Sequence, residues 1–344
     1  MRAVVKVQKG KGFVEVRNVP EPQPGPGEVR IGVEYAGICA SDLHIMNDDI
    51  AFAIRPPVVM GHEFSGTIDR LGNGVEGWRP GDRVVSETSY EVCGACRYCA
   101  SGFYNLCASR KVLGYWYNGA FARYTVVPAR RLHRLPDGIS FRAGALIEPT
   151  ACVAHGVCEL IAIGPGDVVL VTGPGAIGLT ALQVAKAAGA KVIVSGTADD
   201  RGRLELAVKL GADATVDGTA TDLAKTLNDL TAGRGVDVAV ECAGNDRAVR
   251  SAIDALRKQG QLLQLGLFGR DMQLAFDAIV YKELKVTGSL SSRDVSWRRA
   301  LELVERGEVR PELLISGEYP LDGWEEAFRM HASRKGLKIL FKPE

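Results

Sequence analysis

Short stretches in which apolar and polar residues roughly alternate dominate the first 150 residues. The predicted strands cover 2–7, 13–16 and 29–34 and are rich in β-branched residues. A connector of prolines and glycines occupies 20–27, a hairpin turn is expected at 69–74, and a turn at 80–82 leads into another strand. Many short strands with such turns predict a barrel-like antiparallel domain.

From about residue 165 the pattern changes to apolar runs that alternate with segments of helical period. The predicted strands are 167–172, 191–196, 236–241 and 261–266, and the predicted helices are 176–188, 200–210 and 246–258. This alternation predicts βαβ units around a parallel sheet. After about residue 290 it stops, and helical patterns at 294–306 and 321–333 precede a last strand at 337–341.

The length and composition indicate a globular protein with two domains. The chain has 344 residues, of which 46% are hydrophobic and 24% charged. It is therefore longer than one typical core supports and too apolar to be disordered. The formal net charge of +1 gives no electrostatic reason to expect nucleic acid or an anionic membrane as a partner.

Two segments bear on the expected location of the protein. Residues 168–185 carry no charge and are long enough to be tested as a membrane span, but Gly173-Pro174-Gly175 divides them into a strand and a helix. The segment 1–6 lacks the apolar core of a signal peptide. We therefore expect a cytoplasmic protein without a membrane segment.

Two short segments carry side chains that could bind a metal together. The segment 37–44 (GICASDLH) and the segment 61–63 (GHE) each contain an imidazole and a carboxylate, and the first also contains a thiol. Cys39, His62 and Glu63 would give sulfur, nitrogen and oxygen ligands to a zinc with one open position. Each residue also has an ordinary alternative, because a single Cys or His is commonly buried in a core.

Four of the eight cysteines lie close together, at Cys93, Cys96, Cys99 and Cys107. Four thiolates at this spacing predict a closed structural zinc site that stabilises a loop with little core of its own. Iron–sulfur ligation uses similar spacing, and idle reduced thiols are the simplest alternative. In a chain without an export signal, clustered cysteines indicate metal binding rather than disulfide bonds.

A glycine-rich turn, Gly173-Pro174-Gly175-Ala176-Ile177-Gly178, follows a predicted strand and begins a predicted helix. In this context it predicts dinucleotide binding. The first glycine permits a tight turn, the second lets the backbone approach a pyrophosphate, and the third packs the helix on the strand. The amides at the start of the helix would face the phosphates.

The residues after the next predicted strand bear on the choice between NAD and NADP. An acidic residue at the end of that strand would bind the adenosine ribose. Here Asp199 and Asp200 come slightly later, after Thr197 and beside Arg201. No arginine replaces the acid directly, which favours NAD, with NADP as the alternative. The two aspartates could equally cap the following helix.

Taken in order, these motifs resemble those of the zinc-containing medium-chain alcohol dehydrogenases over essentially the whole chain. They are most similar to the branch with sorbitol, galactitol-phosphate and L-threonine dehydrogenases. The resemblance rests on 37–44, 61–63, the four clustered cysteines, Glu148-Pro149 and 173–178. It implies an α/β protein with a GroES-like, β-rich catalytic domain and a Rossmann domain with a doubly wound parallel sheet. The implied domains are 1–154, 155–292 and, returning to the catalytic domain, 293–344.

The resemblance also implies the ligands of a catalytic zinc. Cys39 and His62 would be two of them. Glu63 would be the third, or would exchange with water and Glu148. A resting site formed by all four side chains is consistent with the polyol branch. With the four-cysteine site, this gives two zinc ions per chain.

Three residues of the segment 37–44 receive further roles from the resemblance. Ser41 would join the substrate to a proton relay, and His44 would pass the proton toward solvent. Asp42 would orient His62 from behind. As an alternative, His44 could be an exposed helix residue without a relay role.

The resemblance further implies the cofactor contacts and the assembly. The residues expected to contact NAD are Gly173, Gly175, Ala176, Ile177, Gly178, Thr197, Asp199, Arg201, Gly266 and Ser289. A homotetramer is expected, as in bacterial relatives of this branch.

These features predict a zinc-dependent dehydrogenase that transfers a hydride from a secondary alcohol of a polyol or sugar derivative to NAD(P). L-Threonine or another amino alcohol is the alternative substrate. A non-catalytic NAD(P)-binding scaffold would have lost a ligand, and a zinc-free quinone reductase would lack Cys39, His62 and the cysteine cluster. The chain retains all of them. The segment 115–117 (YWY) could form a wall of the substrate pocket or pack as an ordinary loop.

Overall fold

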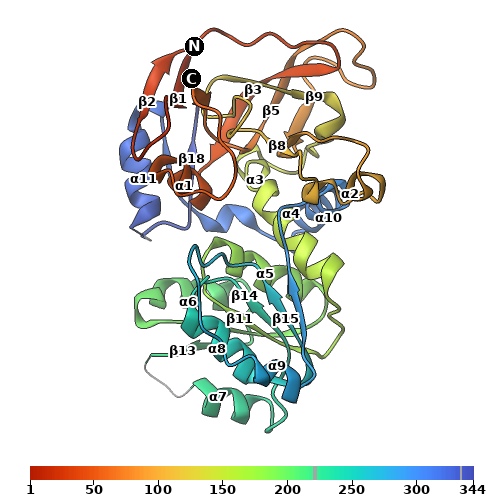
Figure 1. Cartoon of the computed structure of the whole chain (residues 1–344), viewed down its shortest axis with the longest axis vertical. Coiled ribbons are helices and arrows are strands. Elements are labelled where there is room, and N and C mark those ends of the chain that lie inside the picture. The colour runs from red at the N-terminus through yellow and green to blue at the C-terminus, as the bar shows by residue number, and fades with distance from the viewer. Residues whose placement is uncertain (220–222, 334) are drawn as a thin grey trace. The chain divides into compact units, whose positions relative to one another are not determined.

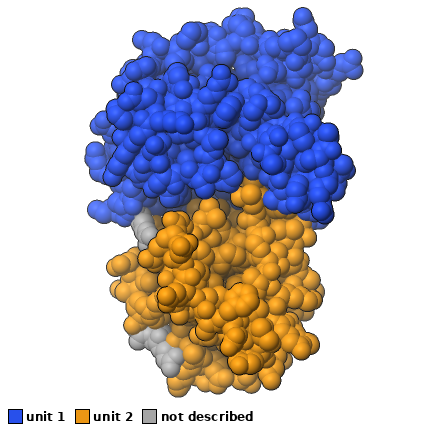
Figure 2. Space-filling view, in the orientation of Figure 1, with its two compact units in different colours: residues 1–151, 292–305, 311–344 blue, residues 152–291, 306–310 orange. Residues whose placement is uncertain are grey.

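The computed structural model describes residues 1–219, 223–333 and 335–344. The chain divides into two compact units, which Figure 2 colours separately. Unit 1 consists of Met1–Ala151, Ser292–Glu305 and Pro311–Glu344, and unit 2 consists of Cys152–Ser291 and Arg306–Arg310. A division of this kind is expected for a chain of this length, because a single core stops growing at such sizes.

Unit 1 is built on a mostly antiparallel seven-stranded sheet (Figure 1). Its order is β10-β6-β5-β3-β18-β17, with β9 paired to β3. These strands are β3 (Glu28–Gly37), β5 (Glu63–Leu71), β6 (Arg83–Ser86), β9 (Tyr124–Pro128), β10 (Leu132–Arg134), β17 (Ile315–Tyr319) and β18 (Lys338–Phe341). Smaller sheets join β1 (Arg2–Lys6) with β2 (Val14–Asn18) and β4 (Val58–Val59), and β7 (Ser89–Glu91) with β8 (Lys111–Val112).

Short helices accompany these strands. They are α1 (Ala40–Asn47), α2 (Arg97–Ala100), α3 (Phe141–Gly144), α10 (Asp294–Glu305), α11 (Trp324–Ala332) and the first part of α4 (Ile147–His155), whose residues from Cys152 on belong to unit 2. The core of the unit joins residues from both ends of the chain, since Phe121 packs edge-to-face on Phe341 at a centroid distance of 4.8 Å. The C-terminal return therefore completes a core that the N-terminal strands begin.

Unit 2 contains a parallel six-stranded sheet in the order β13-β12-β11-β14-β15-β16. The strands are β11 (Val168–Thr172), β12 (Lys191–Gly196), β13 (Ala214–Asp217), β14 (Val236–Glu241), β15 (Leu256–Gln264) and β16 (Lys285–Gly288). The helices are α5 (Ala176–Ala187), α6 (Arg201–Lys209), α7 (Leu223–Leu230), α8 (Asp246–Ala255) and α9 (Asp277–Tyr281). The chain runs outward from β11 on one side and then from β14 on the other, which confirms the predicted doubly wound sheet. The carboxyl ends of β11 and β14 flank the point where the order reverses, where such sheets bind ligands.

The sequence pattern places several boundaries in unit 2 wrongly or misses elements. Helix α8 ends at Ala255 rather than at 258, because Leu256 already pairs with Val236 of β14. The strands β13 and β16 and the helices α7 and α9 were not predicted. They are short, and β16 (KVTG) gains its order from pairing with β15 rather than from an apolar run of its own.

Residues 306–310 belong to unit 2, although the expected division assigned all of 293–344 to the catalytic domain. The backbone amide of Arg310 donates to the side-chain oxygen of Gln183 at 2.8 Å, and its guanidinium donates to the carbonyl of Lys209 at 3.1 Å. Val309 is buried. These contacts with α5 and α6 explain why the segment leaves unit 1 briefly.

Within the described part of the chain, no helix has both the length and the apolar character needed to cross a membrane. The uncharged run 168–185 is divided between β11, the glycine turn and α5, as predicted.

Candidate zinc centre and cofactor site

Cys39 lies where β3 ends and α1 begins. It is the N-cap residue of α1, and its amide donates to a carboxylate oxygen of Asp42 at 2.9 Å. The amide of Asp42 in turn faces the side chain of Cys39, which completes a capping box. The carboxylate in the first turn also suits the positive end of the helix dipole. The local sequence thus fixes the position of the thiol.

The pairing of β3 with β5 brings the second segment to the same place. The register sets Gly37, the last residue of β3, opposite Glu63, so that His62 and Glu63 lie beside the segment that leads from β3 to Cys39. The ligand atoms of Cys39, His62 and Glu63 all lie within 4.8 Å of one another. His62 and Glu63 are buried. The structure therefore brings together three of the four predicted catalytic ligands.

Glu148, the fourth predicted ligand, lies in the first turn of α4 and is also buried. It is outside the group of three, yet it is near enough for its charge to raise the pKa of His62. This arrangement leaves both predicted alternatives for the third ligand, Glu63 and Glu148, beside the same imidazole.

The surroundings of His62 fit a bound cation. Burial alone would lower the pKa of His62, but Asp42, Cys39 and Glu148 raise it to about 10. The Oδ1 atom of Asp42 and the Nδ1 atom of His62 are buried 3.8 Å apart, and neither has a hydrogen-bond partner among the described residues. A zinc ion held by Cys39 and His62 would balance the negative charge, and Asp42 would be placed to take the ring N–H.

A buried lysine, which the sequence analysis missed, completes this group. Nζ of Lys338 lies 2.5 Å from the Oε2 atom of Glu63 and 3.0 Å from the carbonyl of Ile38. Burial opposes the charge of Lys338, but Glu63 and Cys39 raise its pKa above the usual value. The sequence contained one indication of this role, because Lys338 is the only charged residue in the otherwise apolar strand predicted at 337–341.

The two predicted relay residues, Ser41 and His44, have different surroundings. Oγ of Ser41 lies 3.4 Å from the Nε2 atom of His62. The ring of His44 is exposed, and its Nδ1 atom pairs with the Oδ1 atom of Asp49 at 2.8 Å. The positions suit a path from a half-buried hydroxyl toward solvent, and they equally suit an exposed helix residue at position 44.

Among the three aromatic residues of the segment 115–117, Tyr115 lies at the site. Its ring meets the ring of His62 edge-on at a centroid distance of 5.4 Å, and its hydroxyl pairs with Ser41. Burial raises the pKa of Tyr115 well above the usual value, so the phenol stays protonated. Tyr117 points elsewhere, stacked on Tyr90 at 3.8 Å.

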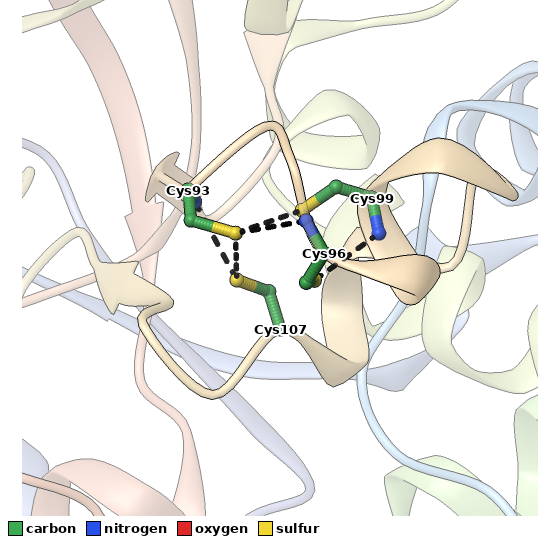
Figure 3. A group of neighbouring side chains, drawn as sticks. All are labelled: Cys93, Cys96, Cys99 and Cys107. Atoms are coloured by element: carbon green, nitrogen blue, oxygen red, sulfur yellow. Dashed lines mark hydrogen bonds between the residues drawn. The ribbon is translucent and has the colours of Figure 1, made fainter.

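The four clustered cysteines converge as their spacing predicts (Figure 3). Their sulfur atoms all lie within 4.8 Å of one another, with Cys93 3.6 Å from Cys107 and 3.9 Å from Cys99. Backbone amides donate to the sulfurs, and those of Ala95 and Cys96 lower the pKa of Cys93 to about 6. Sulfurs held as acceptors at this separation suit one tetrahedral zinc ion.

The glycine turn between β11 and α5 has the geometry that its sequence predicts. Gly173 has a φ of +91°, and a Cβ atom on Gly178 would lie 2.0 Å from the carbonyl of Gly173. A Cβ atom on Gly175, by contrast, would meet nothing within 4 Å. Ala176 and Ile177 form the first turn of α5. The turn therefore combines tight packing with open space above its second glycine, as a bound pyrophosphate requires.

The acidic residues after β12 behave differently from each other. The carboxylate of Asp200 accepts from the backbone amide of Thr197 at 3.1 Å and from its hydroxyl at 2.8 Å. Asp199 is exposed. The side chain of Arg201 is exposed and pairs with Glu205 at 3.3 Å. Asp200 therefore caps the short 3-10 turn Ala198–Asp200 and forms no side-chain cap bond to α6, so the predicted capping of the following helix is not seen for Asp200, whereas Asp199 is exposed to solvent.

The two predicted contacts near β15 lie around a buried carboxylate that the sequence analysis missed. Glu241, at the end of β14, accepts from the amides of Ala243 and Gly244 at 2.8 and 2.9 Å. A Cβ atom on Gly266 would lie 2.5 Å from the Oε2 atom of Glu241. The amide of Ser289 donates to the carbonyl of Gln264 at 3.1 Å. Packing against Glu241 therefore requires glycine at position 266, independently of the predicted contact with the cofactor.

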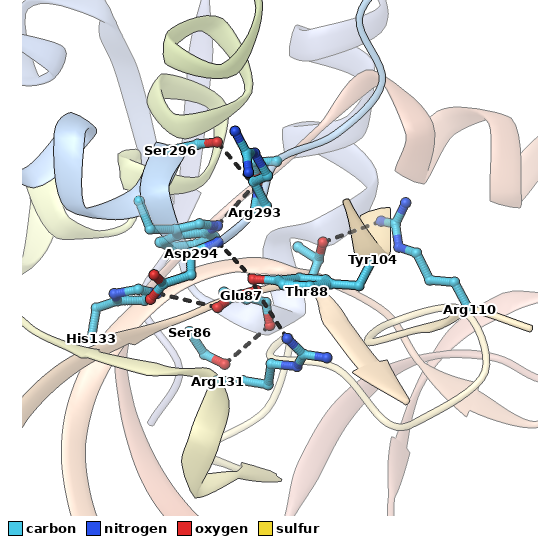
Figure 4. Close-up of polar contacts among 12 residues, drawn as sticks. Ser86, Glu87, Thr88, Tyr104, Arg110, Arg131, His133, Arg293, Asp294 and Ser296 are labelled. Carbon is cyan, nitrogen blue, oxygen red and sulfur yellow. Dashed lines mark hydrogen bonds and ion pairs between the residues drawn. The ribbon is translucent and has the colours of Figure 1, made fainter. Parts of the chain in front are cut away.

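A separate polar cluster in unit 1 ties the cysteine loop to the returning chain (Figure 4). The hydroxyl of Tyr104 donates to the Oε2 atom of Glu87 at 2.7 Å and accepts from the backbone amide of Asp294 at 2.6 Å. Arg131 and His133 each approach Glu87 at 3.4 Å. The guanidinium of Arg131 neutralises the buried carboxylate, so this cluster is an internal ion network.

Comparison with known families agrees with this architecture. Residues 25–137 match the alcohol dehydrogenase GroES-like domain, and residues 176–306 match the zinc-binding dehydrogenase family. The first match covers β3, α1 and the cysteine loop, and the second begins at α5 and covers the strands of the parallel sheet from β12 to β16.

Curated relatives match the chain over nearly its full length. It is 43% identical to a sorbitol dehydrogenase of Halalkalibacterium halodurans, over 100% of the chain and 99% of that protein. It is 38% identical to a D-arabitol-phosphate dehydrogenase of Enterococcus avium, over 99% and 97%. An L-threonine 3-dehydrogenase of Pyrococcus horikoshii is 37% identical over 99% and 98%.

Solved structures show the same fold. A zinc-binding dehydrogenase of Sinorhizobium meliloti bound to NADP has a TM-score of 0.91 and 33% identity over 99% of both chains. Galactitol-1-phosphate dehydrogenase of Escherichia coli has a TM-score of 0.89 and 30% identity over 100% of both chains. The chain belongs to the zinc-containing medium-chain alcohol dehydrogenases, which confirms the GroES-like and Rossmann folds and an NAD(P)-dependent alcohol dehydrogenase activity.

Proposed function

We propose that the protein oxidises a secondary hydroxyl of a polyol or polyol derivative with NAD(P). The observation that carries this proposal is the convergence of Cys39, His62 and Glu63 within 4.8 Å, with the Ser41 hydroxyl 3.4 Å from the imidazole. The sorbitol and arabitol-phosphate dehydrogenases among the relatives support a polyol. The threonine dehydrogenases support L-threonine as the second candidate.

Cys39 and His62 would hold the catalytic zinc, with Glu63 or Glu148 as the third ligand. When bound there, zinc supplies a Lewis acid that lowers the pKa of a substrate hydroxyl. Oγ of Ser41 would accept the released proton while the hydroxyl gives up its own proton toward His44. Its neighbour Tyr115, buried and protonated, would orient that hydroxyl.

The remainder of the proposed proton path leads through His44. Its imidazole is exposed on α1 and would exchange the proton with solvent. Asp42 would hold the ring of His62 from behind once the two side chains close the 3.8 Å gap between them.

The cofactor half of the reaction is proposed for unit 2. The open space over Gly175 and the amides at the start of α5 suit the pyrophosphate. The exposed Asp199 supports NAD, and the NADP-bound relative keeps NADP as the alternative. Thr197, Arg201, Gly266 and Ser289 remain proposed contacts.

Two zinc ions per chain are part of the proposal. The second ion would be held by Cys93, Cys96, Cys99 and Cys107 and would stabilise the loop without taking part in the reaction. Its thiolates favour a reducing compartment, which supports the cytoplasm as the place of action.

We also propose a homotetramer. Strand β16 is the last strand in the order of its sheet, so one of its edges offers unpaired backbone groups. Large apolar side chains near it are exposed, namely Phe276 at 66%, Val280 at 64% and Tyr281 at 76%. A second copy of the chain that covers this region would remove the strand edge and the apolar side chains from water.

The decisive experiment is the initial rate of nicotinamide reduction with zinc-loaded protein. NAD and NADP would each be combined with polyols, polyol phosphates and L-threonine. We expect one polyol class to exceed L-threonine clearly in kcat/KM. The reverse order would replace the polyol with the amino alcohol.

The variant Cys39→Ser tests the site itself. We expect it to lose turnover while it still binds NADH, because the thiol belongs to unit 1 and the glycine turn to unit 2. Cys158→Ser is the matched control and should remain active. Turnover at the wild-type rate in Cys39→Ser would disprove the proposed zinc ligand.

A further inference from the structure

A groove of about 690 Å³ lies in unit 1, outside the set of zinc ligands. Its lining includes Lys9, which follows β1, the segment from Asp48 to Pro56, which follows α1, and Trp116. None of Cys39, His62 and Glu63 lines it. Its size is within the range of small-molecule sites.

Two cations in this groove have no anionic partner. Lys9 and Arg55 are exposed, and neither forms an ion pair with a carboxylate of the described residues. The guanidinium of Arg55 lies over the indole of Trp116, 5.7 Å from the ring centroid. This stacking restricts the side chain and leaves its N–H donors free for a ligand.

The charge of the groove is positive overall. The carboxylate of Asp48 opposes it, although one of its oxygens already accepts from the amide of Gly10 at 2.9 Å. Behind the groove, the buried ammonium of Lys6 is held by carbonyl groups, such as that of Gly12 at 2.7 Å, and adds to the positive field. Two cations and one carboxylate thus line the groove, and a third cation lies buried behind it, so a small anion would be attracted.

The groove is linked to the candidate active site through two adjacent residues, because Trp116 lines the groove and Tyr115 contacts His62. The backbone amide of Arg55 donates to the carbonyl of Tyr115 at 2.8 Å. The side chain of Tyr115 contacts His62 and Ser41. Helix α1, which carries Ser41, ends at Asn47, and its C-cap residue Asp48 lines the groove. A substrate that reaches past Tyr115 from the zinc ligands would meet Arg55.

We propose that this groove binds the phosphate group of a polyol phosphate, with Arg55 and Lys9 as its ligands. The inference rests on the proposed function, which it refines from polyols in general to phosphorylated ones. A guanidinium forms paired, charge-assisted hydrogen bonds with phosphate, and a lysine adds a point charge. The apolar side chains of Phe52 and Ile54 in the groove would lie along the carbon chain.

Other substrates fit these cations less well. A neutral polyol offers them no opposite charge. L-Threonine carries a carboxylate, but only one carbon separates it from the carbinol carbon, so the carboxylate would stay beside the zinc ligands. The zinc ligands do not line the groove. A substrate bound to both would therefore have to be longer than L-threonine and carry its anionic group at the end away from the carbinol carbon.

The test compares D-sorbitol 6-phosphate with D-sorbitol as substrates of the zinc-loaded enzyme. We expect a lower KM for the phosphate. Arg55→Gln and Lys9→Gln should each raise that KM roughly tenfold, which corresponds to the loss of one charge-assisted hydrogen bond. Neither should change the KM for D-sorbitol. Arg55→Lys should restore part of the loss, because it keeps the charge but not the paired donors.

Lys11→Gln is the matched control, because Lys11 is an exposed cation near the groove that does not line it. It should leave both KM values unchanged. Equal KM values for the two substrates in the wild type, unaltered in Arg55→Gln, would overturn the phosphate site and leave polyol oxidation standing.

Binding measured without turnover separates the two proposals. Calorimetric titration with D-sorbitol 6-phosphate should show binding to the wild type and a loss of roughly tenfold in Arg55→Gln. If neither compound is oxidised but the wild type still binds the phosphate more tightly than Arg55→Gln does, the phosphate site would be supported and the proposed function would be rejected. Binding that is equal in wild type and Arg55→Gln would reject the groove.

Discussion

The buried pair of Glu63 and Lys338 determines how much charge the candidate zinc centre carries. Glu63 is 1% and Lys338 is 4% exposed. The carboxylate of Glu63 would have two partners, a zinc ion and Lys338. Its Oε2 atom already accepts a hydrogen bond from the ammonium of Lys338. The pair therefore holds the Glu63 side chain in place, and Lys338 acts on the site through it.

We predict that Lys338→Met destabilises the metal-free protein by about 3–5 kcal/mol. The substitution leaves the Glu63 carboxylate buried without a partner, and breaking a buried pair from one side has a cost of this order. Urea unfolding at neutral pH measures the change. The double variant with Glu63→Gln should recover much of the loss, and Lys342→Met is the exposed control. A single variant as stable as the wild type would contradict the role of the pair.

The strand–turn–helix formed by β11, the glycine turn and α5 separates structural from ligand-binding glycines. Gly178 has no room for a side chain, since its Cβ atom would lie 2.0 Å from a carbonyl oxygen. Gly175 has room and an ordinary φ of −77°. The fold alone does not require glycine at position 175. The lack of a side chain there therefore indicates that a ligand occupies the space.

We predict that Gly175→Ala leaves the melting temperature unchanged and weakens NADH binding roughly tenfold, because its methyl group would occupy space meant for the pyrophosphate. Fluorescence titration with NADH and thermal unfolding measure the two effects. Gly178→Ala should instead lower the melting temperature. Unchanged NADH affinity in Gly175→Ala would place the pyrophosphate elsewhere.

Strands β11 and β14 are joined by a carboxylate as well as by their ladder. Asp237 accepts from the amide of Val168 at 2.8 Å and from Arg257 at 2.6 Å. Burial opposes its ionisation, but these donors lower the pKa of Asp237 below 3.8 on balance. A lowered folded-state pKa stabilises the fold above the unfolded pKa, and this contribution is lost as the pH falls through the folded value.

We predict that Asp237→Asn is less stable than the wild type by about 1–2 kcal/mol at pH 7. Since the wild type loses the same contribution in acid, the difference should shrink as the pH falls below about 4. Urea unfolding at several pH values tests this, with the exposed Asp271→Asn as control. A difference that is constant with pH would show that the charge of Asp237 has no part in it.

For the whole molecule, the proposed tetramer is the feature most open to a direct test. We predict that Phe276→Asp combined with Tyr281→Asp reduces the oligomeric mass, because two charges would be buried against a partner. Light scattering after size-exclusion chromatography measures the mass. Val208→Asp, at a residue that is 55% exposed on α6, is the control. An unchanged mass in the double variant would move the interface to another surface.

The sequence by itself determined the features that depend on near neighbours in the chain. The spacing of the four cysteines and the glycine turn are local patterns, and each has the geometry that its residues predicted. The alternation of long apolar strands with helices likewise fixed the parallel sheet. Side-chain chemistry and backbone preference act over a few residues, so the structures that depend on them can be predicted from the sequence.

Only the tertiary structure decided which distant residues meet. Lys338 pairs with Glu63 from the far end of the chain, and Tyr115 reaches Ser41 from another loop. Residues 285–288 form strand β16 because they pair with β15 through backbone hydrogen bonds. Such contacts follow from packing and strand register rather than from local pattern, and the cost of burying a charge alone then selects its partner. For this reason the sequence indicated the zinc ligands but not the charges that balance them.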